Sequence, residues 1–213
     1  ETISIHRPKI VVIGSCNTDM VVKANRLPVP GETILGGTFY MNPGGKGANQ
    51  AIAAARLGAE VTFISKIGYD LFGLQALEIY RSEKINTEYI FTDQKSPSGV
   101  ALISVDSFGE NSIIVAPGAS RSLSIEDINK AEEKIKEADI ILMQLEIPID
   151  TVEYAATIVA NREKGNPQSG SRVQPEQLIL KKRAHHTPNR IEAEMLSGIK
   201  VMNIESAHRA AQA

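Results

Sequence analysis

Polar side chains able to bind a polyhydroxylated ligand follow two predicted strands of this 213-residue chain. Asn17 and Asp19 come shortly after an apolar run at residues 9–14, and Glu146 directly follows a second apolar run at residues 139–145. In an open parallel sheet, ligands bind outside the carboxyl ends of the strands, so these groups would meet at one edge. Carboxylates accept hydrogen bonds from hydroxyls, and an amide both donates and accepts. The alternative is that Asn17 and Asp19 only stabilise a turn.

A glycine-rich stretch, Gly-Gly-Lys-Gly-Ala-Asn-Gln at residues 44–50, is a second candidate binding element. Glycines just before a helix let backbone N–H groups approach a ligand closely, and Lys46 and Asn49 lie near the expected helix start. The stretch is not a Walker A loop, because no Ser or Thr follows Lys46. It is not a Gly-x-Gly-x-x-Gly fingerprint either, because Gln50 occupies the last position. A flexible turn that only caps the helix is the alternative interpretation.

The elements that must position these residues alternate between strands and helices. Gly58 is placed to stop a helix, and Ser124 with Asp127 forms a capping-box pattern at the start of another. The alternation predicts an α/β fold, a three-layer α/β/α sandwich with a mainly parallel sheet. We expect strands at residues 9–14, 60–65 and 139–145, and helices at residues 47–57, 70–84, 124–137, 151–160 and 205–213.

Two stretches interrupt this alternation and predict a separate small β-sheet lid. Residues 16–44 contain short β-like pieces, and residues 99–116 have the pattern of a hairpin with a turn at Ser107-Phe108-Gly109. A lid beside the strand ends would exclude water from the chemistry. We therefore expect residues 16–44 and 99–116 to form the lid, and residues 1–15, 45–98 and 117–213 to form the α/β core.

Composition excludes several classes of protein. The net charge is −2, from 23 basic and 25 acidic residues, which gives no electrostatic reason to expect a nucleic-acid or membrane partner. The single cysteine, Cys16, excludes a disulfide framework and a zinc site built from several thiolates. No apolar run is long enough to span a bilayer, and the N-terminus lacks a signal-peptide core. A cytoplasmic enzyme or binding protein is the remaining expectation.

Several motifs in order resemble the ribokinase-type sugar kinases of the PfkB carbohydrate kinase family. The resemblance covers residues 10–157 and resumes at residue 187. The spacing of the motifs, rather than any one of them, makes the resemblance specific. They are GSCNTD at residues 14–19, PGET at 30–33, GGKGANQA at 44–51, MQLE at 143–146 and TPNRIEAE at 187–194.

This resemblance implies ATP-dependent phosphorylation of the primary hydroxyl of D-ribose to ribose 5-phosphate. Asn189 would bind ATP phosphate and Glu192 would bind Mg²⁺, although an Asn with a Glu three residues later also resembles a capping box. The family further allows a monovalent cation such as K⁺, and pairing of lids implies a homodimer. The residues implied to bind the sugar are Asn17, Thr18, Asp19, Gly45, Lys46, Gly47, Ala48, Asn49 and Glu146.

The sequence departs from the family pattern in two places. Residues 161–186 lack the expected apolar strand and its proline-containing turn, which we interpret as a shifted reading frame or a misassigned sequence. The C-terminal third of the family, including the aspartate that deprotonates the sugar hydroxyl, is not found before Ala213. No catalytic base can therefore be assigned, and we expect the 213-residue chain to have negligible kinase activity, because phosphoryl transfer depends on positioning and charge around the γ-phosphate.

Other functions fit parts of this pattern. A fructokinase or a nucleoside kinase of the same family would differ from a ribokinase in only a few pocket contacts. A non-catalytic sugar-binding protein would keep the sugar pocket without the phosphate machinery. A protein that interacts only through its lid ranks last, because it leaves the polar residues after the strands unexplained.

Overall fold

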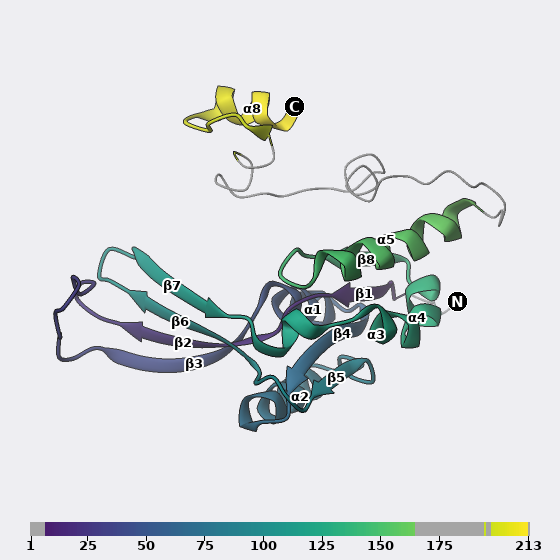
Figure 1. Cartoon of the computed structure of the whole chain (residues 1–213), viewed down its shortest axis with the longest axis horizontal. Helices are drawn as coiled ribbons and strands as arrows, with labels where there is room; N and C mark the ends of the chain where they lie inside the picture. The colour runs from purple at the N-terminus through teal and green to yellow at the C-terminus, as the bar shows by residue number, and fades with distance from the viewer. Residues whose placement is uncertain (1–6, 165–193, 195–196, 213) are drawn as a thin grey trace, which may run out of the picture. The chain divides into compact units, whose positions relative to one another are not determined.

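The computed structural model describes residues 7–164, 194 and 197–212 (Figure 1). The chain divides into two compact units, Glu1–Arg172 and Val173–Ala213, which are described separately. Asn189, Glu192 and most of the atypical stretch at residues 161–186 lie outside the described residues.

A parallel four-stranded sheet in the order β5-β4-β1-β8 forms the centre of the first unit. Ile13 at the end of β1 is in register with Ile64 of β4 and with Met143 of β8. The segments that leave β1 and β8 therefore start at the same edge of the sheet. The strands are β1 (Lys9–Ile13), β4 (Glu60–Gly68), β5 (Ile90–Asp93) and β8 (Ile140–Met143).

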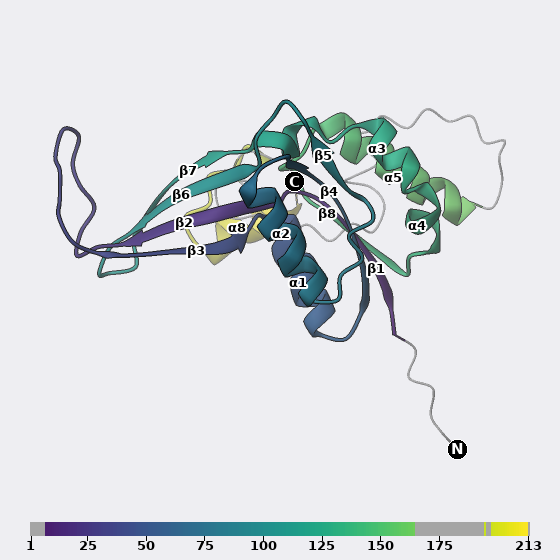
Figure 2. The ribbon, with the colours of Figure 1, turned by 90° about the horizontal axis from the view of Figure 1, so that it is seen from below.

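Helices cover both faces of this sheet. Figure 2 shows α1 and α2 on one face and α3, α4 and α5 on the other. Phe63 of β4 and Tyr80 of α2 are fully buried and pack edge to face, with ring centroids 5.4 Å apart. The expected α/β fold is confirmed. The helices are α1 (Lys46–Arg56), α2 (Leu71–Ser82), the short 3₁₀ helix η1 (Gly118–Ser122), α3 (Ile125–Lys130), α4 (Glu132–Glu137) and α5 (Ile149–Lys164).

Local signals set most helix ends. Gly58 adopts the positive φ of 95° expected of a helix stop, and Ser124 and Asp127 form the predicted capping box. The single helix expected over residues 124–137 is wrong, because the chain makes a tight turn at Ala131. The Ala131 N–H bonds to the Ile128 carbonyl, three residues back, at 3.0 Å, and this ends α3 before α4 starts. The short strand β5 was not anticipated either.

The second sheet has the order β3-β2-β6-β7 and extends from one end of the core (Figure 1). β2 pairs parallel with β6, whereas the outer pairs are antiparallel. The predicted turn between β6 and β7 is confirmed: the Asp106 carboxylate accepts from the backbone N–H groups of Phe108 and Glu110, and Gly109 has φ of 85°. The strands are β2 (Asn17–Lys23), β3 (Thr38–Gly44), β6 (Gly99–Val105) and β7 (Asn111–Ala116).

The described part of the second unit ends in α8 (Ile204–Gln212). Its first turn is capped by Asn203, whose side-chain oxygen accepts from the Ser206 N–H at 2.9 Å. Across residues 7–164 and 197–212, no helix combines the length and apolar character that crossing a membrane requires.

Candidate functional site

The Glu146 carboxylate joins three elements at the carboxyl edge of the core sheet. Ser15 after β1 donates its hydroxyl to Glu146 Oε2 at 2.5 Å, and the Lys46 backbone N–H at the start of α1 donates to the same oxygen at 3.3 Å. The Lys46 ammonium lies 3.4 Å from Glu146 Oε1. The side chains of Glu146 and Lys46 are 36% and 55% exposed, so both groups remain accessible to a ligand.

Asp19 brings a second carboxylate toward Glu146 from the lid. Its carboxylate lies directly over the Cα of Gly44, where a Cβ atom would overlap it. Burial raises the pKa of Asp19, and the negative charge of Glu146 raises it further. The lid and the core therefore place like charges near each other. This arrangement suits a ligand whose hydroxyl groups donate hydrogen bonds to the two carboxylates.

The glycines of the GGKGAN stretch allow α1 to start against the segment that leaves β1. Gly45 has φ of 90°, and a Cβ there would lie 2.8 Å from the Ser15 carbonyl oxygen. A Cβ on Gly47 would lie 2.7 Å from the same oxygen. Ala48, also buried, donates its N–H to that carbonyl at 3.0 Å. Gly47 and Ala48 therefore pack closely against the backbone of Ser15.

Asn49 occupies a different environment from these buried neighbours. It is exposed one turn after Lys46, so both residues lie on the same face of α1. Its backbone N–H donates to the Gly45 carbonyl at 3.0 Å.

The amide of Asn17 is turned toward the lid junction. Asn17 is in register with Gly99 of β6, and its side-chain oxygen packs against the Gly99 Cα, where a Cβ would overlap it. That oxygen is buried and has no hydrogen-bond donor among the described residues.

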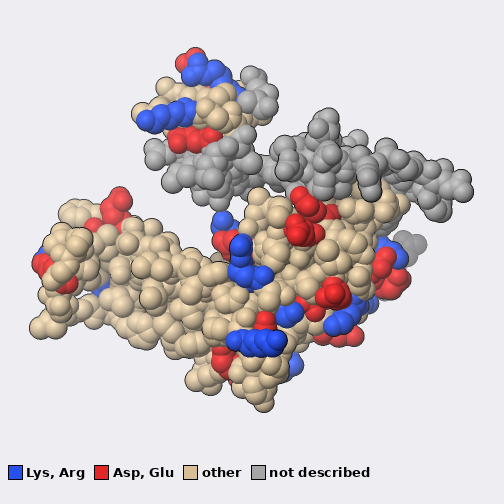
Figure 3. Space-filling view, in the orientation of Figure 1, with Lys and Arg blue, Asp and Glu red and all other residues tan. Residues whose placement is uncertain are grey.

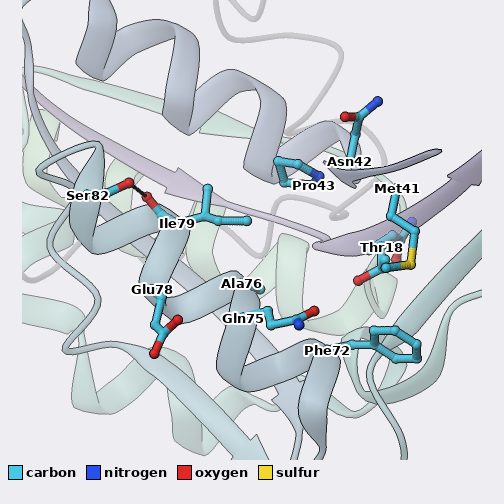
Figure 4. A pocket seen from close by; sticks show the side chains of 11 residues that line it. Thr18, Met41, Asn42, Pro43, Phe72, Gln75, Ala76, Glu78, Ile79 and Ser82 are labelled. Carbon is cyan, nitrogen blue, oxygen red and sulfur yellow. Dashed lines mark hydrogen bonds between the residues drawn. The ribbon is translucent and has the colours of Figure 1, made fainter.

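A cavity of about 460 Å³ lies between the base of the lid and α2. Asn17 and Thr18 line it, whereas Asp19, Lys46 and Glu146 do not. Figure 4 shows Thr18 and Met41 of the lid strands near Phe72 of α2. The structure therefore gathers Asp19, Lys46 and Glu146 at one place and leaves Asn17 and Thr18 at the border of a separate hollow.

Ser15 was not among the predicted binding residues, although it makes the shortest hydrogen bond to Glu146. The signal that could have revealed it is its position as the first polar side chain after β1. Among the residues that the structure describes, no three His, Cys, Asp or Glu side chains come together as a metal site would require. The predicted magnesium ligand, Glu192, lies outside this part of the chain.

Comparison with known proteins matches residues 7–213 to the pfkB family carbohydrate kinases. A ribokinase of Haemophilus influenzae is 41% identical over 210 residues, covering 96% of this chain and 67% of that protein. A deoxyribokinase of Salmonella typhi is 36% identical, covering 95% and 67%. An Arabidopsis thaliana ribokinase solved with ribose and ATP superposes with a TM-score of 0.75 at 30% identity, covering 97% and 68%. The chain spans about two thirds of the length of these proteins.

Two glycine substitutions should have different effects, one on sugar binding and the other on the stability of the fold. In Gly44→Ala the atoms nearest the new Cβ belong to the movable Asp19 carboxylate, so we expect a folded protein with weakened sugar binding. In Gly47→Ala it meets the backbone of Gly14 and Ser15 at 2.7–2.8 Å, so we expect a loss of stability of about 1–3 kcal/mol. Thermal unfolding and ribose titration measure the two effects, and equal losses of stability would contradict the distinction.

Asp19→Asn should stabilise the protein at neutral pH. The folded-state pKa of Asp19 is raised above its usual 3.8, so the ionised side chain disfavours folding at all pH values above that raised pKa. The penalty disappears as the pH falls below 3.8, where the group is protonated in both states. Urea unfolding at several pH values should show a variant more stable than wild type at pH 7, with the gain lost in acid. A variant less stable at pH 7 would show that the Asp19 charge supports the fold.

Proposed function

Because the chain belongs to the pfkB family of carbohydrate kinases, we propose that it carries the sugar-binding part of an ATP-dependent kinase that phosphorylates the primary hydroxyl of D-ribose. The observation that carries this proposal is the grouping of Asp19, Lys46 and Glu146 where the lid meets the core. The similarity to ribokinases over most of the chain supports the choice of sugar.

The chemistry of this group suits a sugar with several free hydroxyls. The carboxylates of Asp19 and Glu146 would accept hydroxyl protons, and the Lys46 ammonium would donate to a sugar oxygen. Asn49, on the same face of α1 as Lys46, adds an amide that can donate and accept. A site built in this way rejects analogues lacking a hydroxyl, because its polar groups would lose their partners.

Phosphoryl transfer adds requirements that the sugar site alone does not meet. Orientation of the hydroxyl is the contribution of Asp19, Lys46 and Glu146, since the reaction depends on positioning and on stabilising charge. We propose that Asn189 contacts ATP phosphate and that Glu192 holds Mg²⁺, which would neutralise phosphate charge when bound. K⁺ is a further proposed ion, and the catalytic base remains unassigned.

Calorimetric titration with D-ribose tests the proposal, with 2-deoxy-D-ribose, D-fructose and ATP titrated separately. We expect saturable ribose binding that Glu146→Gln weakens by about tenfold or more, because a hydrogen-bonded charge is lost. Glu137→Gln on α4, which removes an exposed carboxylate paired with Lys134, is the matched control and should bind as wild type does.

Each sugar result selects a different function. The 36% identity to a deoxyribokinase makes 2-deoxyribose the closest competitor, and preference for it would replace ribose as the substrate. Preference for fructose would favour a fructokinase. Ribose binding without ATP binding would favour a non-catalytic sugar-binding protein, whereas normal turnover of ribose and ATP would show that the expectation of negligible activity is wrong. Absence of binding to every sugar would overturn the sugar-site proposal.

We also propose that the lid pairs with a second copy of the chain. Phe39, Leu102 and Ile114 share the face opposite Asp19 and are 58%, 52% and 69% exposed. Figure 3 shows few charged side chains on the visible face of the lid strands, in contrast to the core. Antiparallel sheets with one solvated face usually keep that face polar, and large exposed apolar patches mark interaction sites.

A cytoplasmic location remains a prediction of the sequence.

Neighbouring isoleucines of β7 provide a test of this homodimer. Ile114→Glu places a charge on the proposed contact face and should shift the protein to a monomer in sedimentation or light scattering, because an unpaired charge is costly in an interface. Ile113→Glu changes an isoleucine on the opposite face, also exposed at 50%, and should keep the dimer. A wild-type chain that is monomeric at high concentration would rule out the pairing.

A further inference from the structure

We propose that Asp70 is a positioning residue, which fixes where the chain passes from the core into lid strand β6 and so places the sugar-binding end of β2. Asp70 lies at the start of α2, outside the group formed by Asp19, Lys46 and Glu146. The anchoring part of this proposal is independent of the sugar, and its consequence for binding rests on the proposed function.

Asp70 makes more hydrogen bonds than a helix cap requires. Its Oδ1 accepts from the Gly73 N–H at 2.9 Å, which caps α2. Oδ1 also accepts from the Ser98 hydroxyl, and Oδ2 accepts from the Ser98 backbone N–H, both at 2.7 Å. Ser98 is the last residue before β6. One carboxylate therefore binds the start of a core helix to the entry of a lid strand.

Ser98 is held by the core from a second side as well. Its hydroxyl oxygen accepts from the Gly68 N–H at the end of β4, at 3.0 Å. With Asp70 on the other side, the hydroxyl both donates and accepts, and Ser98 is only 7% exposed. Burial acts to raise the pKa of Asp70, but the hydrogen bonds from Ser98 and Gly73 outweigh it and lower the pKa. The ionised carboxylate is thus the form that the junction stabilises.

Glycines allow these three segments to meet. A Cβ on Gly68 would overlap the Ser98 backbone nitrogen, and a Cβ on Gly73 would overlap the Gly68 carbonyl oxygen. The chain that leaves β7 belongs to the same region. Pro117 directly follows this strand, and the next residue, Gly118, has φ of 51°. The backbone at Ser98, where the chain enters β6, therefore packs directly against the backbone of the core. Its position depends on the Asp70 side chain that binds it.

The junction leads directly to the end of β2 that carries Asn17 and Asp19. Gly99, next to Ser98, is in register with Asn17 and packs against the Asn17 amide oxygen. Two residues further along, Ala101 is in register with Asp19. A shift of Ser98 would move β6, and the parallel ladder would carry that shift to the Asn17 and Asp19 backbone. Asp70 thereby acts on the sugar through the lid without touching it.

Asp70→Ala and Ser98→Ala test the proposal, with Ser124→Ala as the matched control. Ser124 also caps a helix, so its loss costs comparable helix stability, but it has no bond to a lid strand. Hydrogen exchange of the β6 amides at residues 99–105 gives a readout that needs no ligand. Ribose titration of the same three proteins gives the second readout.

We expect faster exchange at residues 99–105 in Asp70→Ala and Ser98→Ala, relative to both wild type and Ser124→Ala. We expect ribose affinity to fall by roughly three- to thirtyfold in the first two variants and to stay unchanged in the control. Asp70→Asn, which keeps one acceptor oxygen, should be intermediate. If Asp70→Ala does not fold, Ser98→Ala decides the question.

Exchange at β6 equal to that of Ser124→Ala would overturn the anchoring role. Faster exchange with unchanged ribose affinity would overturn the positioning role while leaving the anchor intact. A wild-type chain that does not bind ribose overturns the proposed function and, with it, the link to the sugar, whereas the exchange result still decides whether Asp70 anchors the lid.

Discussion

The close approach of α1 to the segment after β1 is the constraint on which the proposed binding edge depends. Gly45 and Gly47 have no Cβ, so the first turn of α1 lies against the Ser15 carbonyl. That approach places the Lys46 N–H and ammonium beside Glu146, which has arrived from β8. Ser15 then binds the same carboxylate. A larger residue at position 47 would separate the elements that carry the proposed ligand-binding groups.

The same edge carries two carboxylates, those of Asp19 and Glu146. Burial raises the pKa of Asp19, and the negative charge of Glu146 raises it further. Hydroxyl donors from a ligand would stabilise the ionised form of both carboxylates, which fits the chemistry of the proposed ligand. Asp70 contrasts with this pair, because its hydrogen bonds lower its pKa and the ionised form stabilises the lid junction.

The lid would combine the proposed ligand binding and the proposed association in one four-stranded sheet. One face carries Asp19, and the other presents Phe39, Leu102 and Ile114 to solvent. A four-stranded sheet with apolar side chains on both faces is incomplete by itself, because neither face is suited to water. A ligand on one side and a second copy on the other would satisfy both faces, and Asp70 would fix the entry of β6 between them.

Local patterns in the sequence determined the α/β class, most strands and helices, the capping box at Ser124 and the stop at Gly58, because these depend on residues close together in the chain. The family resemblance also predicts nine sugar-binding residues, among them Asp19, Lys46 and Glu146, and this binding role stays a prediction. Only the tertiary structure decided which groups meet: Ser15 with Glu146, the Asn17 amide with Gly99, and Asp70 with Ser98. These partners are 28 to 131 residues apart in the chain and are joined by strand register and backbone packing, which no local pattern encodes. The break at Ala131 was missed for a related reason, since propensity alone does not reveal where packing favours a turn within a helical run.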